Sequence, residues 1–219
     1  MVKAKIAMLV ALLTLFTCAA WARTNYTSAD TQETNKAAQT LKDMTSSAQV
    51  PKGLLNQAQC IGVVPGLTKA GFIVGGEHGS GVVSCKTDSG WSAPAFFSIT
   101  GGSVGLQAGA ASSQIVLLMD QQGKQNVLNG NFKLSANAVA AGPTGNGYNA
   151  SAAWSAPILS YSKSNGAYAG VNIKGSTIQL DTGRIHTAYG ANITAQQVLN
   201  GSVQAPQQAQ NFESALPHA

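Results

Sequence analysis

The chain has 219 residues, and only 10% of them are charged, with 13 Lys and Arg side chains against 8 Asp and Glu. Nucleic-acid binding needs a concentrated basic stripe, whereas the basic residues here are scattered along the chain. The sequence also contains no P-loop, no G-x-G-x-x-G fingerprint and no H-E-x-x-H motif, which excludes the usual nucleotide and zinc-protease signatures. We expect neither a metal nor a cofactor.

The N-terminus has the pattern of a secretory signal peptide. A basic start, MVKAK, precedes the apolar run IAMLVALLTLFTCAA and a small residue at Ala22, which predicts cleavage there. We therefore expect residues 1–22 to be removed and the mature chain to be periplasmic or secreted, with 11 basic against 8 acidic side chains. A lipoprotein anchored at Cys18 is the alternative, but Thr17 fits poorly before a lipidated cysteine.

The start of the mature chain is typical of a helix rather than a strand. Residues 23–28 are polar, and we expect a loose linker there. Residues 29–47 carry Ala, Gln, Lys and Leu but neither Gly nor Pro, which predicts one helix. Its expected thin apolar seam consists of Ala37, Leu41 and Met44. Ser28 or Asp30 is the expected N-cap, because either side chain can accept a hydrogen bond from a backbone N–H group. Pro51 then begins a short helical turn.

Residues 58–120 are rich in glycine and nearly free of charge. Short apolar runs such as 61–64 and 115–119 are separated by glycines rather than by helical spacers. That pattern indicates tightly turned strands whose backbones pass close together. We predict an α+β fold of mainly antiparallel strands, in which a barrel-like or sandwich-like curled sheet has the N-terminal helix packed on it.

The mature length suits a single domain. After it, residues 202–219 are mostly Gln, Ala and Pro, with little apolar surface to bury. This composition predicts a disordered tail.

Cys60 and Cys85 are the only cysteines of the mature chain. An oxidising compartment and an even count favour a disulfide between them. Two separate buried thiols are the alternative, and the sequence leaves both open. Two cysteines so far apart, without a nearby His pair, do not match the ligand spacing of a zinc site.

The sharpest enzymatic pattern is GGSVG at residues 101–105, which matches G-x-S-x-G. Ser103 would be the nucleophile, with Asp120 or Asp181 and then His186 following in the chain order of α/β-hydrolases. The motif requires a turn from strand to helix, but the residues that follow are typical of a strand and a glycine turn. A secreted serine hydrolase is therefore only the second alternative function.

The sequence AQCIGVVPGLTKAGFIVGGEHGSGVV, at residues 58–83, resembles the opening of the SYLF domain, or Ysc84-like, family. Further matching stretches follow in the family's order: SVGLQAGA, VLLMD, YSKSNGAYAGVNIKGS and AYG. The resemblance assigns roughly residues 29–201 to one SYLF domain. Cys60 departs from the small residue usual at its position, and TGRIHTAYG after Asp181 replaces a more polar run that ends in two tyrosines.

Eukaryotic relatives in this family are implicated in phosphoinositide membrane binding, and some fungal members in actin binding. The resemblance implies an exported, non-enzymatic protein that engages anionic lipid or membrane surfaces. Actin binding is not expected, because a signal peptide takes the protein away from a cytoskeleton, and in a bacterium other anionic lipids than phosphoinositides are accessible. A structural or partner-binding envelope module is the first alternative.

Five lysines are the candidate lipid contacts: Lys36, Lys42, Lys52, Lys69 and Lys163. Lys69 best matches the family's characteristic run. Apolar residues among them are expected near the acyl boundary of the membrane, namely Leu41, Leu54, Leu55 and Phe72. The alternative, which the sequence leaves open, is that these are ordinary solvated lysines.

Overall fold

The computed structural model of the protein describes residues 25–71, 74–104, 109–144, 154–164 and 173–218. The predicted signal peptide lies outside these residues. The described helices are α1 (Ser28–Ser46), α2 (Lys52–Gln57), α3 (Gln121–Leu128), α4 (Thr182–Tyr189), α5 (Ala195–Leu199), the 3-10 helix η2 (Gln207–Ala209) and α6 (Gln210–Glu213). The strands are β1 (Cys60–Gly71), β2 (Val74–Thr87), β3 (Gly90–Trp91), β4 (Ala95–Val104), β5 (Gly109–Met119), β6 (Phe132–Lys133), β7 (Val139–Ala141), β8 (Ile158–Ser164) and β9 (Thr177–Leu180).

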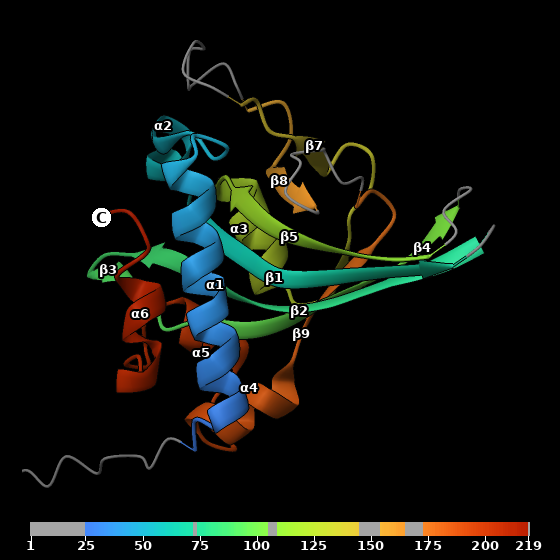
Figure 1. Ribbon diagram of the computed structural model, residues 1–219. Coiled ribbons are helices and arrows are strands. Elements are labelled where there is room, and N and C mark those ends of the chain that lie inside the picture. The colour runs from blue at the N-terminus through green and yellow to red at the C-terminus, as the bar shows by residue number, and fades with distance from the viewer. Residues whose placement is uncertain (1–24, 72–73, 105–108, 145–153, 165–172, 219) are drawn as a thin grey trace, which may run out of the picture.

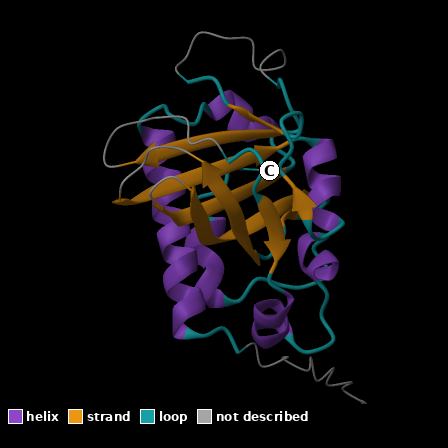
Figure 2. Cartoon of the chain, turned by 90° about the vertical axis from the view of Figure 1, so that its right-hand side faces the viewer, coloured by secondary structure: helices purple, strands orange, loops and turns teal. Residues whose placement is uncertain are grey.

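The strands form one curled sheet in the order β6-β9-β4-β2-β1-β5-β8-β7, with β3 paired to β2. The described pairs are antiparallel, apart from the parallel pair of β7 and β8. The helices gather around one end of this sheet, and the far ends of β1, β2, β4 and β5 extend beyond them (Figure 1). Seen toward those far ends, the sheet has helices on both sides (Figure 2). The predicted α+β class and curled sheet are confirmed.

The N-cap of helix α1 lies one residue before Ser28, the first of its two expected positions. Thr27 is the N-cap, and its hydroxyl accepts a hydrogen bond from the backbone N–H of Asp30, while the Asp30 carboxylate accepts one from the backbone N–H of Thr27. This reciprocal capping box satisfies two N–H groups that a helix start leaves unpaired. The predicted apolar seam holds, because Ala37, Leu41 and Met44 are fully buried.

Glycines in β2 allow it to lie unusually close to β1. A Cβ atom built at Gly81 would lie 2.2 Å from the carbonyl oxygen of Val63, and one at Gly79 would lie 2.8 Å from a Val64 methyl. The β1–β2 register shifts between Val63 and Gly66, so the strands meet at a bulge where a side chain has no room. The glycine spacing seen in the sequence therefore reflects direct backbone contact.

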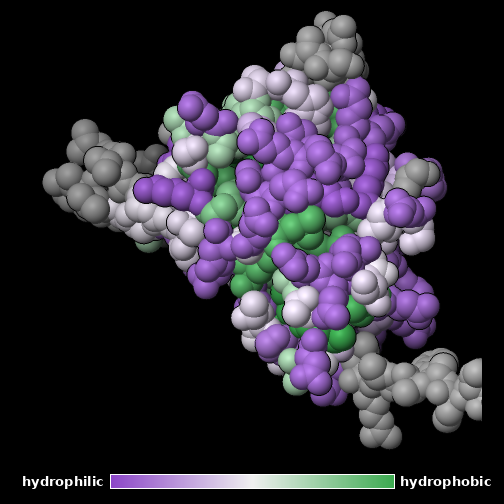
Figure 3. Space-filling view, turned by 180° about the vertical axis from the view of Figure 1, so that it is seen from behind, coloured by the Kyte–Doolittle hydropathy of each residue, from purple (hydrophilic) through white to green (hydrophobic). Residues whose placement is uncertain are grey.

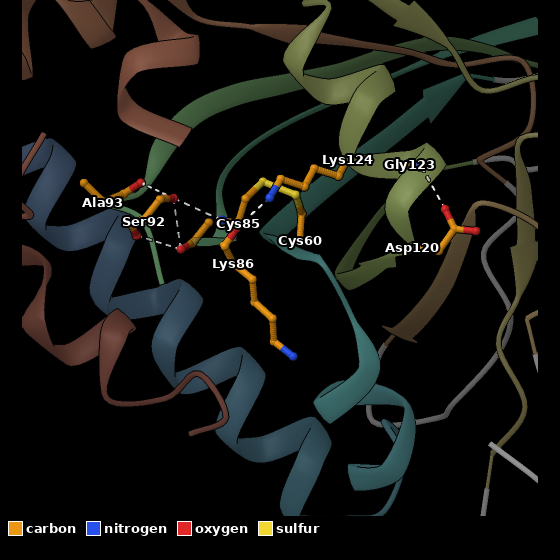
Figure 4. The surroundings of a disulfide bond; sticks show 9 residues. Cys60, Cys85, Lys86, Ser92, Ala93, Asp120, Gly123 and Lys124 are labelled. Atoms are coloured by element: carbon orange, nitrogen blue, oxygen red, sulfur yellow. Dashed lines mark hydrogen bonds between the residues drawn. A yellow bond between two sulfur atoms is a disulfide. The ribbon is translucent and has the colours of Figure 1, made fainter. Parts of the chain in front are cut away.

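A disulfide joins Cys60 of β1 to Cys85 of β2, directly across the ladder (Figure 4). The two residues are 25 positions apart, and closing a loop of this length restricts the unfolded chain by about 3 kcal/mol in the entropy account. Beside the disulfide, Lys124 of α3 donates a hydrogen bond to the carbonyl oxygen of Lys86 at 2.6 Å. The end of the long β1–β2 hairpin that lies among the helices is thus held by the disulfide and by a hydrogen bond from helix α3.

The hydrophobic core continues to the back of the molecule. Seen from behind, the surface is largely hydrophilic, with a hydrophobic area near its centre (Figure 3). Apolar side chains that are only partly buried against the core include Leu128, Phe132 and Ile193. Helix α1, in contrast, lies in front of the sheet in the view of Figure 1.

The prediction of a disordered tail is wrong. Residues 207–213 form η2 and α6, which pack on α1. Ala209 and Phe212 are fully buried and Leu216 nearly so. The spacing of these three apolar residues puts them on one face of a helical segment. The prediction failed because it considered the overall Gln, Ala and Pro composition and not this spacing.

An ion-pair cluster holds the start of α1 against α4. The Arg184 guanidinium contacts Asp30 at 2.7 Å and Glu33 at 2.9 Å, and it lies over the ring of Phe96 at 4.0 Å from the centroid. A stacked group whose N–H donors reach two carboxylates suits a planar guanidinium and not an ammonium group. Sequence reasoning noted the run that contains Arg184 only as a departure from the family.

The two acids of this cluster respond to it in opposite ways. Burial alone would raise the pKa of Asp30, but hydrogen bonds from Thr27 and Arg184 outweigh it and lower that pKa below its ordinary value. Burial raises the pKa of Glu33, and the contact with Arg184 does not offset it. The difference follows from the contacts, because one Glu33 oxygen, Oε1, is buried without a hydrogen-bond partner.

We predict that Asp30→Asn lowers the free energy of unfolding at neutral pH by about 2 kcal/mol, since it removes the negative charge from the hydrogen bonds that Asp30 accepts from Thr27 and Arg184. The Asp30 contribution is present above its unfolded pKa and is lost as the pH falls through its lowered folded pKa. Glu33 has the opposite sign: its contribution is present at acid pH and is lost as the pH rises through its raised pKa. Glu33→Gln should therefore cost no stability at neutral pH. Urea unfolding of both variants at about pH 7 and about pH 4 measures this, and equal losses at neutral pH would contradict it.

Candidate functional site

The five candidate lysines do not form one surface. Lys36 and Lys42 are exposed on α1, and Lys52 is exposed on α2. Lys69 lies near the far end of β1, nine residues after Cys60, which corresponds to about 30 Å along a strand. Lys163 of β8 pairs in register with Gln114 of β5, which lies level with the bulge in the middle of β1. The structure thus separates three helical lysines from two strand lysines.

The ammonium group of Lys69 forms an ion pair with a neighbouring strand of the sheet. Its Nζ lies 2.7 Å from Oε2 of Glu77, and the two side chains are 15% and 2% exposed. The two residues are register partners of β1 and β2. The Ser176 hydroxyl, just before β9, donates a hydrogen bond to the other Glu77 oxygen. A nearly buried carboxylate thus has a partner for each oxygen, as burial of a charge requires.

A glycine makes room for this cluster. Gly101 of β4 is the register partner of Glu77 on the other side of β2. A Cβ atom at Gly101 would lie 2.9 Å from Glu77 Oε1 and 2.5 Å from the Ser176 hydroxyl oxygen. The cluster therefore joins β1, β2, β4 and the chain leading into β9, and sequence reasoning missed both Ser176 and Gly101. The doublet Gly101-Gly102 was the only signal, and it was interpreted as part of an enzymatic motif.

The predicted apolar contacts with lipid are wrong in part. Leu41 and Leu54 are fully buried and Leu55 is 4% exposed, so these side chains belong to the core and cannot reach an acyl boundary in the folded protein. Phe72 lies outside the described residues. Leu41 belongs to α1, and Leu54 and Leu55 belong to α2. An apolar pattern in sequence does not distinguish a core-facing stripe from a lipid-facing one.

The predicted hydrolase triad is not assembled. Ser103 lies within β4, where its backbone pairs with Gly75 of β2, and the next described element is strand β5, not the helix that the motif needs. The side chain of Ser103 lies outside the part of the structure that is described. At the start of β4, the backbone N–H of Asp181 donates a hydrogen bond to the carbonyl of Phe96. This places the start of α4, the helix that carries His186, beside Phe96, which lies seven residues, or about 23 Å, along β4 from Ser103.

The aspartates proposed for the triad have other roles. The Asp120 carboxylate caps α3 by accepting from the backbone N–H of Gly123, and the Asp181 carboxylate caps α4 by accepting from that of Arg184. Asp120 also follows Met119, which pairs with Cys60 at the near end of the sheet. The chain order of a hydrolase therefore arises here without its geometry.

The described residues hold no group of three or more His, Cys, Asp and Glu side chains arranged for a metal ion. Glu77 and His78 illustrate the reason, because neighbouring strand residues point to opposite faces. Glu77 is buried in its cluster, whereas His78 is exposed. Among the described helices, none combines the length and the apolar character that crossing a membrane requires.

Internal ion pairs change the charge that the surface presents. The two clusters engage Lys69 and Arg184 with Glu77, Asp30 and Glu33. Among the described acidic residues only Asp88 is exposed, whereas five lysines are: Lys36, Lys42, Lys52, Lys133 and Lys174. The exposed charge of the described residues is therefore mostly positive.

Comparisons with known proteins connect this fold to a family. The family described as "Ysc84: Las17-binding protein actin regulator" matches residues 100–219, more than half of the chain. The chain belongs to the Ysc84 family. Within the Ysc84 match lie β5, Ser176, Arg184 and the C-terminal helices, whereas Lys69, Glu77 and both cysteines precede it.

Two curated relatives illustrate the similarity. The chain is 32% identical over 189 residues to "LAS seventeen-binding protein 3" of Saccharomyces cerevisiae, which covers 80% of this chain and 41% of the yeast protein. It is 32% identical over 199 residues to "SH3 domain-containing YSC84-like protein 1" of Mus musculus, which covers 84% of this chain and 58% of the mouse protein. The chain therefore spans about half the length of these relatives. No solved structure matches it significantly.

The buried pair gives a prediction for Lys69. Lys69→Met leaves the Glu77 carboxylate buried without its cation, so we expect a loss of about 3 kcal/mol in the free energy of unfolding. The double variant Lys69→Met/Glu77→Gln removes both charges and should recover most of this loss. Thr68→Ala, an exposed change in the same strand, is the matched control. Chemical denaturation measures all three, and a single variant as stable as the native protein would rule out this role of Lys69.

Proposed function

We propose that this protein is an exported, non-enzymatic member of the Ysc84 family that binds anionic lipid surfaces. The observation that carries the proposal is the surplus of exposed positive charge among the described residues, five lysines against one acidic side chain. The resemblance of the chain to a family with membrane-binding members supports the same conclusion.

The lysines of α1 and α2 are the best candidates for the lipid contact. Lys36, Lys42 and Lys52 are exposed, and each well-placed lysine contributes about 1 kcal/mol to binding at an anionic surface. Lys69 is a poorer candidate, because its ammonium group is already paired with Glu77. The predicted contact of Lys163 stays a prediction.

The test is sedimentation with vesicles that contain phosphatidylglycerol as the anionic lipid. The native protein should sediment with these vesicles, and the binding should weaken as salt increases. The triple variant Lys36→Glu/Lys42→Glu/Lys52→Glu should bind at least about tenfold more weakly, since three favourable contacts become repulsive.

Lys133→Glu is the matched control, because Lys133 is exposed on β6 and removed from the first helices. It changes the net charge without touching the proposed surface and should bind nearly as well as the native protein. Equal weakening per charge in both variants would assign binding to net charge alone. Absent or salt-insensitive binding would refute the lipid proposal. Lys69→Glu does not serve this purpose, because it places two carboxylates together inside the sheet.

A protein partner is the alternative. The yeast relative is named as a binding protein of LAS seventeen and the family is described as an actin regulator, so protein contacts are associated with these names. For an exported chain, the corresponding partner would be an envelope protein. Retention of such a partner together with no sedimentation on anionic vesicles would favour this alternative.

Export is supported by two independent features. The N-terminal pattern predicts a signal peptide, and the disulfide between Cys60 and Cys85 suits an oxidising compartment. Mass spectrometry of protein recovered from its native cells should give a chain that begins at Arg23 and has neither Cys60 nor Cys85 open to alkylation before reduction. A chain that retains residues 1–22 in the cytoplasm, with both thiols alkylated, would contradict export.

A further inference from the structure

The C-terminal segment, residues 207–217, occupies a face of α1. Asn211 donates a hydrogen bond to the side-chain oxygen of Asn35 on α1 at 2.7 Å. Beyond α6, the Trp91 indole N–H of β3 donates to the carbonyl oxygen of Pro217 at 2.7 Å. The ribbon shows α6 alongside α1, with the C-terminal end passing between α1 and β3 (Figure 1). We call the surface formed by α1 and Trp91 the α1 docking face.

Three apolar side chains anchor this segment. Ala209, Phe212 and Leu216 are 0%, 0% and 7% exposed, and they follow one another at positions i, i+3 and i+7. Three of the five residues between them are exposed, namely Gln210, Asn211 and Ser214. This is the anchor pattern by which amphipathic helices bind a complementary face on another protein.

The segment forms little helix of its own. It consists of the three-residue η2 and the four-residue α6, far shorter than the length at which a helix is stable by itself. The preceding link passes through Gly201, whose φ is +84°. Exposed Ser202 and Gln204 then alternate with Val203 and Ala205, which pack partly buried against the core. The segment is thus held by its anchors and not by its own secondary structure.

We propose that the α1 docking face is a binding site for an amphipathic helix of a protein partner, with apolar residues at i, i+3 and i+7. The C-terminal segment is its built-in occupant, and the partner helix displaces it. A longer, preformed helix would gain the same three anchors without the cost of ordering two short turns. Lys42 lies seven residues after Asn35 and so shares its side of α1, which favours a partner helix with acidic residues. This proposal is independent of lipid binding.

Hydrogen exchange of the native full-length protein provides the first test. If the segment opens by itself, the amides of residues 209–216 should exchange at least about tenfold faster than the most protected amides of β1, β2 and β5, because local opening needs less energy than global unfolding. Exchange of the segment at the rate of those strands would make it part of the cooperative core and would overturn the proposal.

Displacement is measured with a fluorescent peptide that reproduces residues 203–218, used as the probe helix. In the full chain, Phe212→Ala removes the central anchor and should raise the apparent affinity for the added peptide at least about tenfold over the native chain, because the docking face is open more often. Gln208→Ala, an exposed change in the same segment, is the matched control and should behave like the native chain. A peptide that itself carries Phe212→Ala should not bind.

Two outcomes would refute displacement by a partner helix. A Phe212→Ala chain that retains a native circular dichroism spectrum and yet fails to bind the peptide would show that the face accepts no helix in trans. A concentration-dependent dimer of the native chain, detected by light scattering, would make a second copy the occupant through exchange of the segment. If Phe212→Ala does not fold, the exchange rates of the native protein decide the question.

Discussion

The close approach of β1 and β2 is the constraint on which the rest of the structure depends. Gly79 and Gly81 let the two backbones meet at the bulge after Val63. The same ladder holds the disulfide at its near end and the Lys69–Glu77 pair toward its far end. Because β5 pairs with β1 and β4 pairs with β2, the position of every other strand follows from this pair.

Most acidic side chains of this protein stabilise the fold through ion pairs or helix caps. Of the few acidic side chains, three are engaged in internal ion pairs, and two more cap helices α3 and α4. Buried carboxylates must be matched by cations and hydrogen bonds, and Lys69 and Arg184 supply those cations. What remains outside is a modest excess of lysine, which suits contact with an anionic surface better than chemistry at a reaction centre.

Helix α1 is held along two sides by interactions of different character. At its start, Arg184 connects Asp30 and Glu33 to α4 through directional, charged contacts. Along its length, the C-terminal segment is anchored by Ala209, Phe212 and Leu216, with only side-chain hydrogen bonds such as Asn211–Asn35 in addition. The first attachment fixes the position of α1 on the sheet, whereas the second covers a face that is built to receive a helix.

The sequence by itself determined the fold class, the first helix with its seam of Ala37, Leu41 and Met44, and the strands between glycines. These features follow from local periodicity and from steric limits that act on neighbouring residues. It did not determine which lysines reach solvent, that Ser103 and His186 lie far apart, or that residues 207–213 fold onto α1. Those facts depend on contacts between segments more than 80 positions apart, such as Ser176 with Glu77, Arg184 with Asp30 and Pro217 with Trp91. Only the tertiary structure decides them. Neighbouring residues determine the secondary-structure propensity of a segment, but they do not determine which distant segment it contacts.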